Sequence, residues 1–198
     1  MPDMIKDGSG KNYLVKVTSS QQLLTKSTTE SAAEDANEKG KAYNLNTKNI
    51  TLTDAVDTPI AYLKNNGSDD LVITTVVIGA KPSTGGVSTD LPEITFVRNP
   101  TTGTIITSTP TDISIESNRN YGSSNTLTVD AYVGATGDTL TDGEDHIFVY
   151  GSASGRTALG INEVLPTGTS IGIKFKPQAS NTSQVVYCAF IGYLHTED

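Results

Sequence analysis

The chain of 198 residues has little cysteine, histidine or aromatic content, and it has no tryptophan. Its single cysteine, Cys188, excludes an intramolecular disulfide, and the apolar run over residues 185–191 around it predicts a buried, unreactive thiol. One cysteine and two histidines cannot supply a Cys/His zinc cluster. An aromatic content of 6% disfavours glycosidases and lectins, which use aromatic side chains as platforms for sugars.

Basic residues are also scarce, with 14 Lys and Arg against 22 Asp and Glu and a net charge of −8. Proteins that bind nucleic acids place Lys and Arg along the phosphates. The charge balance therefore predicts no nucleic-acid partner, and we expect it to keep free copies of the protein soluble and apart.

The sequence lacks long apolar runs and the motifs of common catalytic sites. No run approaches the ~20 residues of a membrane span, and the N-terminus has no signal-peptide pattern, so we expect synthesis in a cytoplasm. There is no G-x-S-x-G, no phosphate-binding G-x-x-x-x-G-K-[ST] and no G-x-G-x-x-G that opens a helix. We therefore expect no catalytic residues, no cofactor and no enzyme activity.

An acidic loop, residues 138–145, is the place where a cation could bind, because Ca²⁺ takes several oxygen ligands. The loop does not match the twelve-residue calcium-loop pattern. We favour a solvated hairpin loop around Asp142–Gly143 and predict no metal site, with cation binding as the open alternative.

The chain changes character near residue 42, which predicts an extended N-terminal arm over residues 1–41 and a folded domain over residues 42–198. The arm is polar, apart from a short alternation of Tyr13, Val15 and Val17 that predicts an edge strand. Residues 21–39 have helix-favouring composition but almost no apolar stripe, so we expect a tether that orders only on a partner.

The folded domain consists of short apolar or alternating runs separated by Gly, Asn, Asp and Pro. The alternation of Ile171, Ile173 and Phe175 predicts a strand with one buried face, and the very apolar last strand should be central. Asn66–Gly67 predicts a type I′ hairpin. The fold class expected is all-β, a single antiparallel sandwich of jelly-roll or Greek-key type. The strands expected lie near residues 50–52, 60–63, 71–78, 94–97, 104–107, 113–115, 127–133, 146–150, 160–165, 170–175 and 185–194.

Several exposed-type residues are candidates for partner binding. The set comprises Lys6, Lys11, Tyr13, Val15, Val17, Arg119 and Tyr121. The arm lysines could meet an acidic protein surface or simply keep the arm solvated, and the arm strand could add to a neighbour's sheet. Arg98 and Arg119 could each clamp a carboxylate, either on a partner or as a tie within the subunit.

Loop segments carry a family resemblance. They are residues 62–66, 98–106, 118–124, 165–170 and 177–183, with residues 5–10 and the Tyr-Leu-Val-Lys-Val run that follows. Together they resemble tailed-phage virion structural proteins. The resemblance implies a β-sandwich on a capsid exterior or in a tail part, often trimeric, and it carries no catalytic residues.

We therefore expect a virion structural protein that decorates and stabilises a phage capsid, a cement protein whose arm binds neighbouring subunits. The expected partners are the major capsid protein or other virion proteins, with a homo-oligomer, a trimer by preference, and no nucleic acid or membrane. The alternative is a tail-fibre or baseplate head that binds a host receptor or glycan through loops at residues 81–91 and 118–124.

Overall fold

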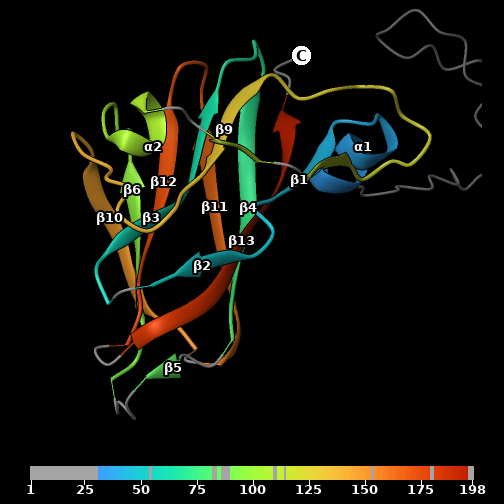
Figure 1. Ribbon diagram of the computed structural model, residues 1–198. Helices are drawn as coiled ribbons and strands as arrows, with labels where there is room; N and C mark the ends of the chain where they lie inside the picture. Colours follow the sequence, from blue (N-terminus) through green and yellow to red (C-terminus); the bar gives the residue numbers. More distant parts are fainter. Residues whose placement is uncertain are drawn as a thin grey trace, which may run out of the picture. The chain divides into compact units, whose positions relative to one another are not determined.

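Figure 1 shows the computed structural model. It describes residues 31–53, 55–81, 84–85, 90–108, 111–113, 115–152, 154–178 and 181–195. The chain divides into two compact units, Met1–Ser31 and Ala32–Asp198. The candidate binding residues of the arm lie outside the described residues: Lys6, Lys11, Tyr13, Val15 and Val17.

The second unit is built almost entirely of strands, in the order α1 (Ala32–Glu38), β1 (Ala42–Asn46), β2 (Ile50–Leu52), β3 (Thr58–Asn65), β4 (Asp70–Ala80), β5 (Thr84–Gly85), β6 (Glu93–Arg98), α2 (Thr104–Thr107), β7 (Thr111–Asp112), β8 (Ile115–Asn118), β9 (Val129–Val133), β10 (Glu144–Tyr150), β11 (Gly155–Leu165), β12 (Ser170–Lys176) and β13 (Asn181–His195). A seven-stranded sheet has the order β11-β4-β13-β1-β8, with β2 and β5 also paired to β13. A six-stranded sheet has the order β10-β6-β12-β3-β9-β7. All pairings are antiparallel, which confirms the expected all-β sandwich.

The order of pairing is that of a jelly roll. Strands pair from the ends of the chain inward: β1 with β13, β3 with β12, β4 with β11, and β6 with β10. The long hairpin that results is rolled up by two further pairings, β13 with β4 and β12 with β6. The last strand is therefore central, as its apolar sequence predicted.

Residues 99–143 form an insertion between β6 and β10, which are otherwise the innermost pair of the rolled hairpin. The insertion contributes β9 and β7, which extend the six-stranded sheet beyond β3, and β8, which extends the other sheet beyond β1. One side of each sheet is thus lengthened by inserted strands. Among the described residues, β10 pairs only with β6 and β11 only with β4, so the opposite side is left open.

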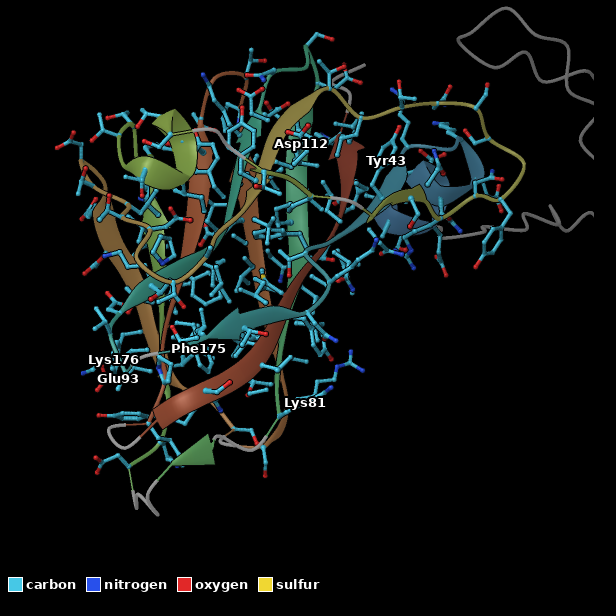
Figure 2. All side chains as sticks on the ribbon, in the orientation of Figure 1. Tyr43, Lys81, Glu93, Asp112, Phe175 and Lys176 are labelled. Carbon is cyan, nitrogen blue, oxygen red and sulfur yellow. The ribbon has the colours of Figure 1, made fainter. Side chains whose placement is uncertain are left out.

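The core lies between the sheets and follows the alternation along the strands. Ile173 and Phe175 are 0% and 1% exposed, which confirms the face predicted for this strand, and they pair with Phe96 and Ile94 of β6. Each such side chain contributes about 1.5–3 kcal/mol by leaving water. Figure 2 labels Phe175 among the side chains of the sandwich, with Lys176 and Glu93 nearby.

A second, smaller core lies on the outer side of the six-stranded sheet and explains one wrong prediction. Residues 104–107, expected as a strand, form helix α2. Gly103, with φ of 126°, turns the chain, and its carbonyl accepts hydrogen bonds from the N–H groups of Ile106 and Thr107. Burial of Ile105 together with Leu140 then overrides the strand preference of Thr and Ile.

Two expected hairpins are also wrong. Asn66–Gly67 connects β3 and β4, which belong to different sheets, and neither residue has the positive φ that a type I′ turn needs. Asp142–Gly143 belongs to a segment that leads from β9 to β10, which are not neighbours in the six-stranded sheet. Both dipeptides mark turns, but the strands on either side of each turn find other partners.

Helix α1 lies within the stretch expected to be a tether. It packs against β13 and β1, and Ala36 is 4% exposed, so the compact unit begins at Ala32 rather than at residue 42. Gly40, with φ of 68°, ends the helix, and the N–H of Lys41 donates to the carbonyl of Ala36. Three alanines and a C-terminal glycine thus suffice for a short helix, which could not be predicted because the sequence lacks an apolar stripe here. Neither described helix has the length and apolarity of a membrane span.

Cys188 lies on the inner face of β13 and is fully buried, as predicted. Burial raises the pKa of its thiol, because the thiolate would lose its hydration. Its N–H donates to the hydroxyl of Thr47 at 2.9 Å, where the chain kinks between β1 and β2. The thiol is therefore an inert part of the core.

Asn65 is a polar residue with no exposed surface at the end of β3. Its Nδ2 donates to the carbonyls of Asp69 and Leu165 at 2.9 and 2.8 Å, and its Oδ1 accepts the N–H of Gly67 at 2.9 Å. Since Leu165 ends β11 of the other sheet, this amide joins the two sheets at one end of the sandwich.

We predict that Asn65→Ala lowers the free energy of unfolding by about 3 kcal/mol, because it leaves buried backbone groups without partners. Urea denaturation measures this change. The exposed neighbour Asn66 provides the control, since Asn66→Ala should change stability by less than about 0.5 kcal/mol. Equal stability of the two variants would contradict the role given to Asn65.

Candidate functional site

The open side of the sandwich is formed by β10 and β11, which follow one another in the chain but belong to different sheets. Their inward side chains, Ile147 and Val149 on β10 and Leu159 and Ile161 on β11, pack against the core but are only partly buried. In Figure 1, β10 is the outermost ribbon of its sheet. Within the described part of the chain, this open edge therefore combines strand backbone that no other strand pairs with and apolar side chains that are incompletely covered.

Two β-bulges interrupt these strands. In β10 the register shifts between Asp145 and Ile147, which leaves His146 as the extra residue. In β11 it shifts between Gly160 and Glu163, next to Asn162 with φ of 49°. A bulge takes a side chain out of the regular alternation and can aim it sideways. The two bulges aim His146 and Glu163 at each other across the gap between the sheets.

The edge cluster consists of Arg98, His146 and Glu163, one residue from each of β6, β10 and β11. His146 Nε2 lies 2.9 Å from Glu163 Oε1, and Arg98 Nη2 lies 3.2 Å from the same nitrogen and 3.9 Å from Glu163 Oε2. A bond to Glu163 requires a protonated Nε2, whereas a bond from Arg98 requires an unprotonated one. The proton on His146 thus decides which neighbour it binds.

A pocket of about 140 Å³ lies beside the edge cluster. Ligand sites for small molecules are usually about 300–1,000 Å³, whereas a cavity of about 150 Å³ accepts one benzene ring. This pocket therefore has room for one side chain of another molecule. Its lining residues are Phe96, Val97, Arg98, Asn99, His146, Glu163, Val164, Leu165, Pro166, Thr169, Ser170 and Ile171.

An aromatic pair lies on the outer side of β10, next to the open edge. Phe148 and Tyr150 are 52% and 61% exposed, and their rings meet edge to face with centroids 5.3 Å apart. Large exposed aromatic side chains are typical anchors of protein interfaces. The alternation of residues 146–150 predicted the strand, but it gave no sign that both faces of that strand would carry apolar side chains.

The predicted residues Arg119 and Tyr121 lie in a loop that packs against the turn after α1. Asn118 Nδ2 donates to the carbonyl of Gly40 at 2.7 Å, and Asn120 Nδ2 donates to that of Glu38 at 3.0 Å. Tyr121 is fully exposed, and neither candidate lines the pocket at the open edge. Their partner role stays a prediction, whereas the asparagines serve as ties within the chain.

Arg98, which the sequence left open between a partner clamp and an internal tie, is an internal tie in this structure. The members of the edge cluster could not be grouped from the sequence, because residues 98, 146 and 163 lie far apart and no motif joins them. The only sign of this site in the sequence is the presence of Gly160 and Asn162, because glycine and asparagine are frequent at β-bulges.

The acidic loop uses its carboxylates to hold the inserted segment in place. Asp138 Oδ1 accepts the hydroxyl of Thr104 at 2.9 Å and its Oδ2 accepts the N–H of Ala135 at 2.7 Å, and the Asp142 carboxylate accepts the hydroxyl of Thr102. Within the described ranges, no three His, Cys, Asp or Glu side chains are grouped to hold a metal ion.

No protein-family model matches the chain, and no curated protein matches it.

We predict that Glu163→Gln loosens the open edge, because it removes the charge that faces His146 and Arg98. Their side chains are 25–50% exposed, so the cost in stability should be only about 0.5 kcal/mol. Hydrogen exchange of amides in β10 and β11 should rise about two- to fivefold, with no change in β3 or β12. Glu144→Gln, which changes an exposed acid at the start of β10, is the control, and equal exchange in both variants would contradict a role for the edge cluster.

Proposed function

We propose that this protein is a structural subunit of a virus particle, a decoration or cement protein of a phage capsid, and that its N-terminal arm binds neighbouring subunits. The observation that carries the proposal is the open edge, where each of β10 and β11 has a described partner strand on one side only, beside a pocket for one side chain. The division of the chain before Ala32 supports it, because Ala32–Asp198 forms a compact unit of its own.

The open edge fits an added strand. Backbone N–H and C=O groups along β10 can pair with an extended segment, and the pocket can take a side chain of that segment. The arm offers such a segment over residues 13–17, whose Tyr, Leu, Val, Lys and Val alternate in the way a strand requires. An arm from one subunit would then bind at the open edge of the next.

Tethering explains how a short arm can hold an assembly together. A single added strand of about five residues binds weakly, because its ordering costs conformational entropy. A subunit already seated on a shell presents its arm at high effective concentration, so several weak contacts act together. The net charge of −8 keeps free copies apart until such a surface is available.

Co-sedimentation with mature shells assembled without this protein tests the proposal. We expect the full-length protein to sediment with the shells, and we expect the variant lacking residues 1–31 to lose at least about tenfold in affinity, because the tether is gone. Protection of Cys188 from a thiol reagent in both forms is the control that the sandwich is folded. Failure of the full-length protein to bind would contradict the proposal.

A second candidate function, a tail-fibre or baseplate head that binds a host receptor or glycan, is favoured by the exposed Phe148–Tyr150 pair. Aromatic faces bind sugar rings and protein side chains alike. The discriminating measurement is attachment of labelled protein to host cells. Attachment that Tyr150→Ala reduces at least about tenfold, with the shells left unbound, would favour this function over decoration.

A further inference from the structure

Strand β10 carries apolar side chains on both of its faces, although exposed edge strands usually carry charges. Ile147 and Val149 point inward and pack against the core, while Phe148 and Tyr150 lie on the outer face. On its free side, β10 has no partner strand among the described residues. A segment that pairs there covers both faces with apolar contacts only if the segment is itself apolar on both faces.

The pocket beside the edge cluster combines buried apolar residues with exposed polar ones. Phe96 and Ile171 are at most 5% exposed, whereas the side chains of Arg98, His146 and Glu163 are 25–50% exposed. The pocket volume of about 140 Å³ is close to that of a cavity that accepts one benzene ring. Tyrosine joins an aromatic ring to a hydroxyl group, so its side chain suits this pocket in size and in polarity.

The arm contains a run with both of these properties, Tyr13–Leu14–Val15–Lys16–Val17. As a strand, the run would carry Tyr13, Val15 and Val17 on one face and Leu14 on the other. Tyr13 is also the only aromatic residue in the sequence of residues 1–41. The run is therefore apolar on both faces, as a partner of β10 must be, and it offers one ring for the pocket.

Charge favours this run as the occupant. Residues 8–29 contain three lysines and no Asp or Glu, a net charge of +3 in a chain whose total is −8. With histidine neutral, the pocket end of the open edge has one more acid than base: its acids are Glu144, Asp145 and Glu163, and its bases are Arg98 and Lys174. Two copies of net charge −8 repel each other, and this contact sets a basic segment of one against an acidic surface of the other.

We propose that Tyr13 from the arm of one copy fills the pocket of a second copy, and that residues 13–17 pair with β10 in the parallel direction. The pocket lies beside His146, near the start of β10, and Tyr13 is at the start of the run. A parallel strand then brings Val15 and Val17 onto the inward face of β10. This assignment rests on the proposed function, because it names the parts of the arm and of the edge that bind.

The place where the arm joins the sandwich favours the edge of a second copy over the edge of the same chain. The arm leads into α1, which packs against β13 and β1. Figure 1 shows α1 and β10 on opposite sides of the sandwich. Fully extended, residues 18–31 span at most about 50 Å, which is enough to reach the edge of an adjacent copy.

Disulfide trapping between two full-length copies tests the proposal, because the native Cys188 is buried. One copy carries Asn12→Cys or Thr18→Cys, on either side of the run, and the other carries Glu144→Cys or Tyr150→Cys, at the two ends of β10. Each pair of positions is separated by about 20 Å along a strand. In mixtures at about 500 µM, we expect Asn12→Cys to link with Glu144→Cys, and Thr18→Cys with Tyr150→Cys, at least about fivefold faster than the crossed combinations.

Substitution of Tyr13 tests the pocket itself. In the Asn12→Cys copy, Tyr13→Ala should slow linking to Glu144→Cys at least about fivefold, whereas Tyr13→Phe should keep the rate, because the ring fills the pocket. Tyr121→Ala is the matched control: Tyr121 is also a tyrosine, is fully exposed and does not line the pocket, so its removal should leave the rate unchanged.

Four results would overturn the proposal. Faster linking of the crossed combinations would show an antiparallel arm, with Tyr13 away from the pocket. Equal rates for all combinations, or equal rates for Tyr13→Ala and the unsubstituted arm, would show that no ring is held there. Linking only within a single chain that carries both Asn12→Cys and Glu144→Cys would place the arm on its own edge. Because this test uses no shells, sedimentation of the full-length protein with shells would still support the proposed function if the trapping fails.

Discussion

The pairing of β13 with β4 on one side and β1 on the other is the interaction on which the sandwich depends. Cys188 and Phe190 of this strand have no exposed surface, and β2 and β5 also pair with it. Leu45 of β1 pairs with Phe190 of β13, so the pairing of these two strands joins residues near the two ends of the described chain. Such long-range pairing is costly in entropy and makes folding slow, so the apolar content of β13 is what makes closure favourable.

The two sides of the jelly roll end in different ways. The insertion of residues 99–143 extends both sheets on one side, while the other ends in β10 and β11. Free strand edges invite aggregation, and proteins protect them with bulges and charges. Here both bulges, the 2.9 Å contact of His146 with Glu163, and Arg98 lie at the open edge. The same devices discourage indiscriminate pairing and shape a pocket, which is the combination expected of an edge reserved for a specific strand.

Much of this fold could be predicted from the sequence, because alternation and burial are local signals. The strand around Ile173 and the central place of the last strand follow directly from the residues. The wrong predictions fall where tertiary contacts decide the local structure. Ile105 is helical because it packs on Leu140. Asn66–Gly67 connects two sheets because the side chain of Asn65 holds the chain where it passes from one sheet to the other. The edge cluster could not be predicted, because only the rolled hairpin and its bulges bring together residues so distant in sequence.

The proposed arm contact has a symmetry that matters for assembly. An arm that binds at the open edge of the next subunit makes a heterologous contact, which propagates from copy to copy until a rotation closes it. A contact of this kind that is individually weak holds only on a surface that fixes many subunits at once. This is the behaviour that a protein needs if it is to reinforce a preassembled shell.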